Sequence, residues 1–283
     1  MKFIGKFMVL GMVLILISGF VANEKKPPRH KGYSLVWSDE FNVDGAPDEK
    51  NWKYEEGFVR NNENQWYQKE NAYCQNGFLV IEAKNESRVN SNFVSKNHQD
   101  WTKNRDSIKV TSSCLITQGK HSWQYGRFEM RAKIPVGKGM WPAFWTLGVK
   151  EDWPANGEID IMEYYTGKIL ANTAWKSKTG TTAWDSSTVP LTDFKKDWAD
   201  EFHVWRMDWD AHSIKLYVDD QLLNETDLKE TMNDSNQKII PFQQPHYLLV
   251  NLAVGGDNGG LFTAASLPSK FMIDYIRVYQ KKK

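Results

Sequence analysis

The sequence predicts a single all-β domain, a sandwich of two antiparallel sheets. Along several segments apolar and polar residues alternate with a period of two, as expected for strands with one buried face. Turns containing Gly, Asn and Asp separate these segments, and no stretch shows the sustained 3.6-residue periodicity of a long helix. The length of 283 residues suits one all-β domain, and no repeat or change in composition divides it.

The strand pattern is clearest in three segments. Residues 127–134 alternate charged side chains with Phe, Met, Ala and Ile, and residues 213–219 alternate in the same way before a turn. In residues 271–279, regular alternation would put four side chains on one face: Met272, Asp274, Ile276 and Val278. Six further strands are predicted, in chain order at residues 34–37, 78–84, 143–149, 171–176, 202–209 and 246–252.

Residues 1–22 have the features of a secretory signal peptide. Lys2 and Lys6 give a positive start, an apolar run follows, and Gly19 and Ala22 are small residues near the expected cleavage point. The apolar run is shorter than the roughly 18 residues that a membrane span needs. Residues 23–31 are polar and contain prolines, which predicts a short disordered linker before the domain at 32–283. We therefore expect a secreted or periplasmic protein without stable membrane insertion, and a monomer.

The charge balance and the aromatic content narrow the class of function. The 36 basic and 35 acidic residues leave a net charge of +1, which argues against nucleic-acid binding because that requires a basic surface. The chain has 13 Trp, 11 Tyr and 14 Phe, which serve either a core or the stacking of rings on sugars. Cys74 and Cys114 are the only cysteines, and they are either paired in an oxidising compartment or buried as free thiols.

Three carboxylates lie in an apolar strand-like segment that reads GEIDIMEYY. Glu158 and Asp160 share a face of a regular strand, whereas Glu163 would point to the opposite face. One bulge residue near Ile161 and Met162 would return Glu163 to the same side, and bulges are common beside active sites. Because a buried carboxylate is costly unless it is paired or faces a cleft, the segment predicts a row of three acids along one cleft.

Two carboxylates about 5–5.5 Å apart are the machinery of a retaining glycoside hydrolase, with one nucleophile and one acid/base. Burial and a neighbouring carboxylate keep the acid protonated near neutral pH. Two alternatives remain open at this point. The acids of an edge strand can face solvent, and three carboxylates can also bind a hard cation.

The segment GEIDIME, preceded by GMWPAFWTLG, resembles the active-site signature of glycoside hydrolase family 16, in its laminarinase-like branch with the extra bulge residue. Four further segments resemble the family in the expected order and span nearly the whole domain: WSDEFN at 37–42, QYGRFEMRAKIP at 124–135, YLLVNLAVGG at 247–256 and IDYIRVYQ at 273–280. The resemblance implies a concanavalin-like β-jelly roll of two curved antiparallel sheets, with the substrate along the concave face.

The resemblance also implies roles for individual residues. Glu158 matches the nucleophile and Glu163 the general acid/base, while Asp160 assists Glu158. Hydrolysis would retain the configuration at the anomeric carbon, and no cofactor is expected for catalysis. A structural calcium on the convex face is implied at Glu40, at the carbonyl of Gly77 and at Asp274, since hard oxygen ligands suit this cation.

Five residues are candidates for binding substrate. Trp141 and Trp145 are four residues apart on one strand face, and both match family positions that line the cleft. Trp153, in the loop before the acids, and Trp175, in the next strand, are weaker candidates whose alternative place is the core. Asn62 matches a loop on the non-reducing side of the cleft, or is a simple turn residue.

The chain also departs from the family pattern. Ser112-Ser113-Cys114 replaces the usual S-G-R, so that a commonly basic position is a cysteine. The strand after the acids reads NTAW, where a histidine often precedes an aromatic residue. Both changes affect the walls of the cleft, so they bear on the identity of the substrate and leave the reaction type unchanged.

We therefore expect a secreted retaining endo-β-glucanase that cleaves β-1,3- or mixed-linkage β-1,3/1,4-glucan, with this polysaccharide as its partner. Two alternatives are a galactan hydrolase of the same family, of agarase or porphyranase type, and a non-catalytic lectin-like module on the same fold. The near-neutral charge favours glucan over a sulfated polymer. The three acids together argue against a lectin, because binding alone does not require a buried acid triad.

Overall fold

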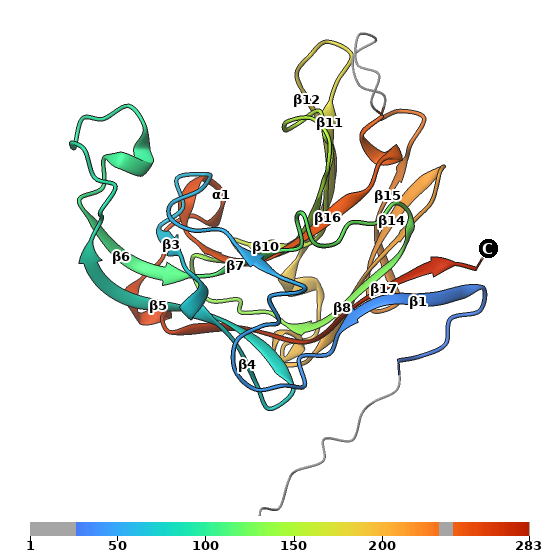
Figure 1. The fold of residues 1–283 in the computed structure, drawn as a ribbon, viewed down its shortest axis with the longest axis horizontal. Coiled ribbons are helices and arrows are strands. Elements are labelled where there is room, and N and C mark those ends of the chain that lie inside the picture. The colour runs from blue at the N-terminus through green and yellow to red at the C-terminus, as the bar shows by residue number, and fades with distance from the viewer. Residues whose placement is uncertain (1–26, 232–239, 283) are drawn as a thin grey trace, which may run out of the picture.

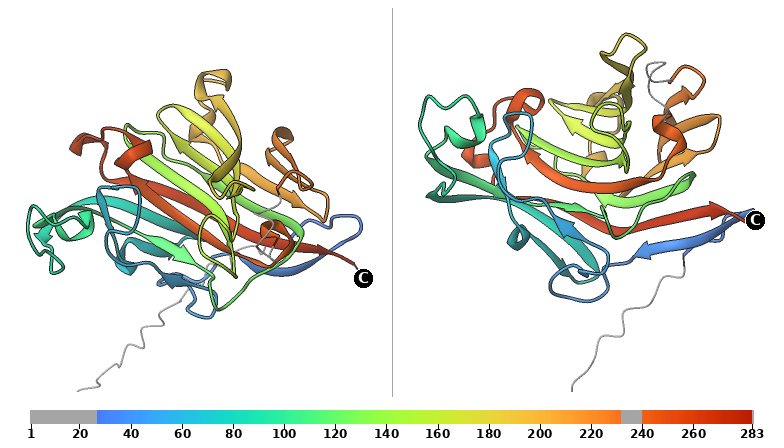
Figure 2. Two further views of the ribbon diagram at one scale, coloured as in Figure 1. Left: turned by 90° about the horizontal axis from the view of Figure 1, so that it is seen from above. Right: turned by 45° about the horizontal axis from the view of Figure 1, so that its top comes forward.

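The computed structural model describes residues 27–231 and 240–282, and two β-sheets stacked as layers make up nearly all of it (Figures 1 and 2). The predicted all-β jelly-roll sandwich is confirmed, and so are all nine predicted strands, with small differences at their ends. Among the described residues, the one α-helix is a single turn, α1 (Gly256–Gly259). The same residues contain six short 3-10 turns: Lys69–Asn71, Trp101–Lys103, Leu191–Asp193, Trp198–Asp200, Pro241–Gln243 and Ala264–Ser266. Within the described ranges, no helix has the length and apolar character needed to cross a membrane.

The ten-stranded sheet forms one layer. Its main path runs, in spatial order, through β15 (Gln221–Asp227), β14 (Ser213–Val218), β13 (His203–Trp209), β8 (Gly126–Lys133), β17 (Ser269–Lys281), β5 (Phe78–Val89), β6 (Ser107–Ser112) and β3 (Gln65–Tyr67). Two strands pair alongside this path, β1 (Tyr33–Asp39) with β17 and β4 (Ala72–Gln75) with β5. All pairs are antiparallel except β3 with β6.

The seven-stranded sheet forms the other layer and carries the acids. Its spatial order is β12 (Thr182–Pro190), β11 (Lys168–Lys176), β10 (Glu158–Tyr165), β9 (Met140–Gly148), β16 (His246–Val254), β7 (Cys114–Ile116) and β2 (Lys53–Tyr54). In Figure 1 the β11–β12 hairpin rises on one side of this layer, and α1 with the chain before β3 lies on the other. Residues from β12, from α1 and from the chain before β3 line one cleft over this sheet.

The core lies between the two sheets, and each strand contributes alternate side chains to it. Phe144 of β9, Ile159 of β10 and Val250 of β16 are fully buried from one side, while Phe128 of β8 and Met207 of β13 meet them from the other. Burial of a side chain of this size contributes roughly 1.5–3 kcal/mol. In each alternating strand the apolar side chains face the core, and this fixes which side chains face away from it.

Strand β17 departs from the regular alternation predicted for it. Its pairing with β8 shifts register between Ile273 and Tyr275, which is a β-bulge. The bulge puts Phe271 and Ile273 on the same buried face as Ile276 and Val278, instead of on opposite faces. The apolar residues of the whole strand thereby reach one core.

Of the two segments predicted before the domain, one lies outside the described residues and the other packs partly against the domain. The signal peptide predicted at residues 1–22 lies outside the described residues. Within the predicted linker, His30 packs edge-on against the ring of Tyr279 with centroids 4.7 Å apart, and its ring also contacts Arg127 and Glu129. The domain therefore includes His30, two residues earlier than the sequence predicts. Cys74 and Cys114 are both buried and unpaired, which settles the open question in favour of free thiols.

Candidate active site

Strand β10 carries the three acids, and it contains the bulge that the sequence predicts. The register of β10 shifts between Asp160 and Glu163 against β11, and between Asp160 and Met162 against β9. Ile161 and Met162 are consecutive, yet both are fully buried in the core. The extra residue turns Glu163 back to the side of Glu158 and Asp160, and all three side chains line one cleft of about 630 Å³.

Burial and mutual repulsion set the protonation of the three acids. Desolvation raises the pKa of Glu163 to about 7, and the Glu158 charge adds to the rise. Asp160, with the strongest burial, has its pKa raised well above its ordinary value by desolvation and by the charges of Glu163 and Glu158. Desolvation also raises the pKa of Glu158, but hydrogen bonds from Asp160 and Trp153 and the charge of Arg60 oppose this. The arrangement therefore favours protons on Asp160 and Glu163 and the negative charge on Glu158.

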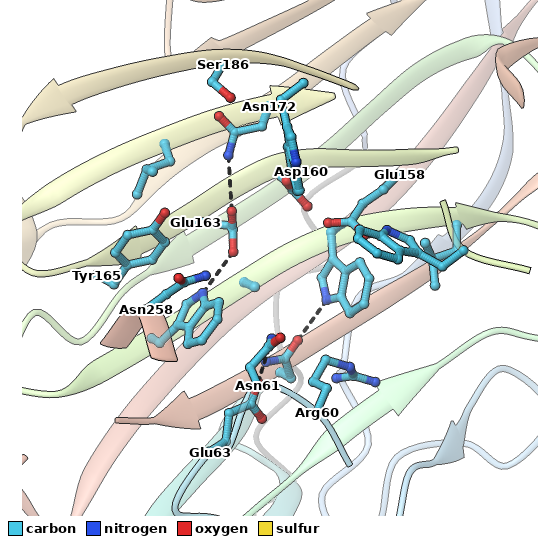
Figure 3. A pocket seen from close by; sticks show the side chains of 18 of the residues that line it. Arg60, Asn61, Glu63, Glu158, Asp160, Glu163, Tyr165, Asn172, Ser186 and Asn258 are labelled. Atoms are coloured by element: carbon cyan, nitrogen blue, oxygen red, sulfur yellow. Dashed lines mark hydrogen bonds between the residues drawn. The ribbon is translucent and has the colours of Figure 1, made fainter. Parts of the chain in front are cut away.

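Two donors hold the carboxyl group of Glu163 in the cleft. The indole Nε1 of Trp141 donates to its Oε1 at 2.8 Å, and Nδ2 of Asn172 donates to its Oε2 at 3.2 Å. Figure 3 shows Asn172 pointing at Glu163 from the neighbouring strand, with Glu158 farther along β10. Each oxygen thus has a fixed partner, which orients the carboxyl group for proton transfer.

Replacement of Trp141 by Phe should move the pH profile of activity. The indole hydrogen bond lowers the pKa of Glu163, so its removal raises that pKa and holds the proton to higher pH. We expect the alkaline limb of kcat/KM to shift to higher pH and the maximum to fall by roughly tenfold, since a hydrogen bond to a charged group is lost. The measurement is the pH dependence of kcat/KM in both proteins. An unchanged alkaline limb would show that Trp141 does not set the protonation of Glu163.

The tryptophans predicted to bind substrate fall into two groups. Trp141, Trp145 and Trp153 line the cleft. Trp175 does not, because Leu170 and Asn172 are the residues of β11 that line the cleft, and Trp175 is an odd number of residues from both. Its side chain points to the opposite face and packs against Phe242 and the core. The prediction for Trp175 is therefore wrong.

The loop before β3 lines the cleft with residues adjacent to the predicted one. Asn61 and Arg60 face the cleft, whereas the side chain of Asn62 donates to both carboxylate oxygens of Asp257 in α1, at 3.1 and 3.2 Å. Asn62 thus ties the loop to α1 instead of lining the cleft. The guanidinium of Arg60 lies over the ring of Trp145, 5.1 Å from its centroid.

Arg60 also supplies a positive charge near Cys114, where the chain departs from the family pattern. It forms an ion pair with Glu55, and its charge acts on the buried thiol of Cys114, so the two residues are close. A cation is therefore present near the position where the family pattern commonly has a basic residue, supplied from a different loop. Burial raises the pKa of the Cys114 thiol well above its ordinary value, so this cysteine is not a nucleophile.

A buried chain of hydrogen bonds links Trp145 to Glu63. Trp145 Nε1 donates to Asn251 Oδ1 at 2.8 Å, Asn251 Nδ2 donates to the Tyr67 hydroxyl at 3.0 Å, and that hydroxyl donates to Glu63 Oε2 at 3.3 Å. Gln65 Nε2 donates to the same oxygen at 2.6 Å. The other oxygen of Glu63 accepts from Asn61 Nδ2 at 3.2 Å, so Glu63 positions a side chain that lines the cleft as well as the support of Trp145.

Substitution of Glu63 by Ala should destabilise the domain and weaken substrate binding together. Glu63 is 2% exposed, and its loss would leave buried donors of Gln65 and Tyr67 without an acceptor. We expect a loss of roughly 2–4 kcal/mol in the free energy of unfolding, measured by urea denaturation, and a rise in KM larger than the fall in kcat. The exposed Glu70→Ala variant is the control. Equal stability of the two variants would contradict the structural role of Glu63.

Two of the three residues predicted to bind calcium, Glu40 and Asp274, are engaged with arginines. Both oxygens of Glu40 accept from Arg277, at 2.8 and 2.7 Å, and Asp274 accepts from Arg131 at 2.6 Å. In this arrangement they do not fit a cation, and the described part of the chain has no group of three His, Cys, Asp or Glu suited to a metal. Calcium binding stays a prediction, and no step of the reaction is assigned to it.

Sequence reasoning missed much of the cleft wall. The further lining residues come from the loop before β3, from strands β9, β10, β11, β12 and β16, and from α1: Arg60, Asn61, Glu63, Ala143, Leu147, Tyr165, Leu170, Asn172, Trp184, Ser186, Thr188, Asn251 and Asn258. For Asn172 a signal was available, because the pairing of β11 with β10 aligns it with Asp160. The others depend on the order of strands in space, which no local pattern contains.

Comparison with known proteins places the chain in a family. The model of glycosyl hydrolases family 16 matches residues 59–277, which include β10 and every acid of the cleft. The chain belongs to glycosyl hydrolase family 16. It is therefore a glycoside hydrolase, and the resemblance drawn from the motifs is confirmed.

The names of similar proteins of comparable length indicate different substrates. The chain is 34% identical to a "Beta-glucanase" of Rhodothermus marinus, over 95% of this chain and 93% of that protein. It is similar to the structure of SCLam, a non-specific endo-β-1,3(4)-glucanase, with TM-score 0.72, 36% identity and 89% and 93% coverage. A structure from work on endo-acting O-glycanases of human gut microbiota that initiate mucin breakdown has TM-score 0.81, 38% identity and 90% and 94% coverage.

Proposed function

We propose that the protein is a retaining endo-hydrolase of β-1,3- or mixed-linkage β-1,3/1,4-glucans. The observation that carries the proposal is the bulged β10, which puts Glu158, Asp160 and Glu163 in one cleft with different protonation. Family membership and the full-length similarity to a β-glucanase support the substrate. The aromatic lining supports it as well, because flat rings stack on the apolar faces of sugars.

The reaction would proceed by double displacement. Glu163, protonated near neutral pH, gives its proton to the glycosidic oxygen as the bond to the anomeric carbon breaks. Glu158 attacks that carbon and forms a covalent glycosyl-enzyme. Glu163, now ionised, then takes a proton from water, which attacks the same carbon and releases Glu158. The two inversions give net retention.

Asp160 would act through Glu158. Because Asp160 holds its proton, its carboxyl group can donate a hydrogen bond to the Glu158 carboxylate, which lowers the pKa of Glu158. The nucleophile thereby stays ionised in a buried site, beside an acid that must stay protonated. Replacement of Asp160 would remove a hydrogen bond that lowers the pKa of Glu158.

The experiment that tests the proposal is release of reducing sugar from a panel of polymers. Laminarin, barley mixed-linkage glucan, agarose, keratan sulfate and gastric mucin are incubated with the protein and with its Glu158→Gln variant. Activity on either glucan that disappears in the variant is the expected result. Release from none of the polymers, with laminarin still bound, would overturn the proposal in favour of a lectin-like module.

A second candidate is cleavage within an O-linked glycan or a galactan. The similarity to the structure from the O-glycanase work has a higher TM-score and identity than the similarity to SCLam, and it favours this candidate. The segment NTAW, where a histidine often precedes an aromatic residue, and Cys114, at a commonly basic position, are the departures from the family pattern that bear on the substrate. Activity confined to mucin, keratan sulfate or agarose would keep the mechanism and change the substrate.

We also propose that the protein acts outside the cytoplasm, as a monomer. Residues 1–22 support export by their composition, and a polysaccharide substrate is itself too large to enter a cell freely. N-terminal sequencing of the exported protein, expected to begin shortly after Ala22, tests this location. A retained residue 1 in the mature protein would contradict it.

A further inference from the structure

The edge strand β12 presents a second wall to the cleft that the mechanism does not use. Its residues alternate, with Trp184, Ser186 and Thr188 lining the cleft and the residues between them turned away. Trp184 pairs with Ala174 on β11, and Ala174 pairs with Glu158 on β10. Trp184 therefore lies on the same row as Glu158, two strands and about 10 Å away.

Trp184 is exposed in a way that indicates a ligand. It is 49% exposed, and Trp153 is 50% exposed, while Trp141 and Trp145 are below 10%. Trp184 and Trp153 are the two tryptophans among the exposed large apolar residues of the described chain, and both line this one cleft. An indole left half in water at a cleft wall has a free face on which the apolar side of a sugar ring can stack.

The two ends of the cleft differ in how far they are enclosed. The order of the reaction steps indicates which part of the substrate each end binds. At one end Trp141, Trp145 and Asn251 are nearly buried and fixed by hydrogen bonds. At the other, β12 exposes its side chains. In a double displacement the glycosyl part stays attached to Glu158 while the leaving part departs first. The enclosed end therefore suits the sugar that is held, and the open end suits the sugar that leaves.

We propose that Trp184 is the stacking platform for the first sugars on the leaving-group side, and that β12 thereby selects a neutral pyranose there. The inference rests on the proposed function and adds a substrate-recognition site to it. Ser186 and Thr188 offer hydroxyl groups for hydrogen bonds to the same sugars, and the three side chains of β12 that line the cleft carry no charge. A sulfate or carboxylate on the leaving sugar would find no cation on this strand.

The test compares a polymer with a substrate that carries no sugar on the leaving side. The polymer is whichever of laminarin and barley mixed-linkage glucan the unaltered protein cleaves faster, and the second substrate is the matching 4-nitrophenyl disaccharide. For Trp184→Ala we expect about a tenfold loss of kcat/KM on the polymer, mainly in KM, and at most a twofold loss on the nitrophenyl glycoside. Trp184→Phe, which keeps a ring, should recover most of the polymer activity.

Val189→Ala, on the opposite face of β12, is the matched control and should leave both activities unchanged. Equal losses of Trp184→Ala on the two substrates, or no loss on the polymer, would overturn the inference while the proposed function stands. Cleavage of none of the polymers by the unaltered protein would overturn the proposed function, and the inference with it.

Discussion

Replacement of Glu158 by Gln is expected to reduce polymer hydrolysis by about 10⁴-fold or more, because the amide cannot form the glycosyl-enzyme. Gln is nearly isosteric with Glu. Burial already disfavours the charged form of Glu158, so loss of the charge should leave the fold intact. Initial rates of reducing-sugar release, with binding of laminarin measured in parallel, test this. Glu225→Gln, the same change at an edge strand of the other sheet, is the control.

The nucleophilic role of Glu158 has a sharper test in chemical rescue. A Glu158→Gly variant leaves room beside the anomeric carbon, and added azide should restore cleavage of an activated aryl glycoside. The azide would attack the face that Glu158 occupies, so the product is the α-glycosyl azide. Restoration with a β-glycosyl azide, or no loss of activity in Glu158→Gln, would contradict the assignment.

Replacement of Glu163 by Ala is expected to give the second large effect, which depends on the leaving group. Polymer hydrolysis should fall by roughly 10³-fold, because an alkoxide leaving group needs a proton. The first step on a 2,4-dinitrophenyl glycoside should be nearly retained, since that leaving group departs without one. Burst kinetics, which separate formation of the glycosyl-enzyme from its hydrolysis, measure the two steps.

The pH profile gives an independent readout of Glu163. Its pKa is raised to about 7, and the acid acts only while protonated, so activity of the unaltered protein falls as the pH rises through about 7. In Glu163→Ala the residual hydrolysis of the polymer should lack this alkaline limb. Persistence of the limb in the variant would assign the ionisation to another group.

The chemistry of the acid strand was predictable from sequence because three carboxylates in an apolar run leave few arrangements. Only a bulge lets Ile161 and Met162 share the core while the acids share a cleft, and the register shift lies there. In β17 the same device was not foreseen, because Asp274 and Tyr275 fit either face and the alternation looks regular without a bulge.

The walls of the cleft were harder to predict, for reasons that differ by residue. Trp175 was misplaced because its orientation follows from which residues of β11 line the cleft, and the isolated strand does not reveal this. Asn61 and Asn62 are neighbours in a turn, where no periodicity decides which side chain faces the cleft. Trp184 lies in a strand that is polar on both faces, so nothing in its sequence marked it as part of the sheet.

The measurement that tests the central claim most directly is the configuration of the first product. Proton NMR of a polymer or oligosaccharide during the first minutes of hydrolysis, before mutarotation, resolves the two anomeric signals. Double displacement through Glu158 and Glu163 predicts that the β-anomer of the new reducing end appears first, and the α-anomer only later. Initial appearance of the α-anomer would mean a single displacement by water, and would contradict the roles assigned to both glutamates.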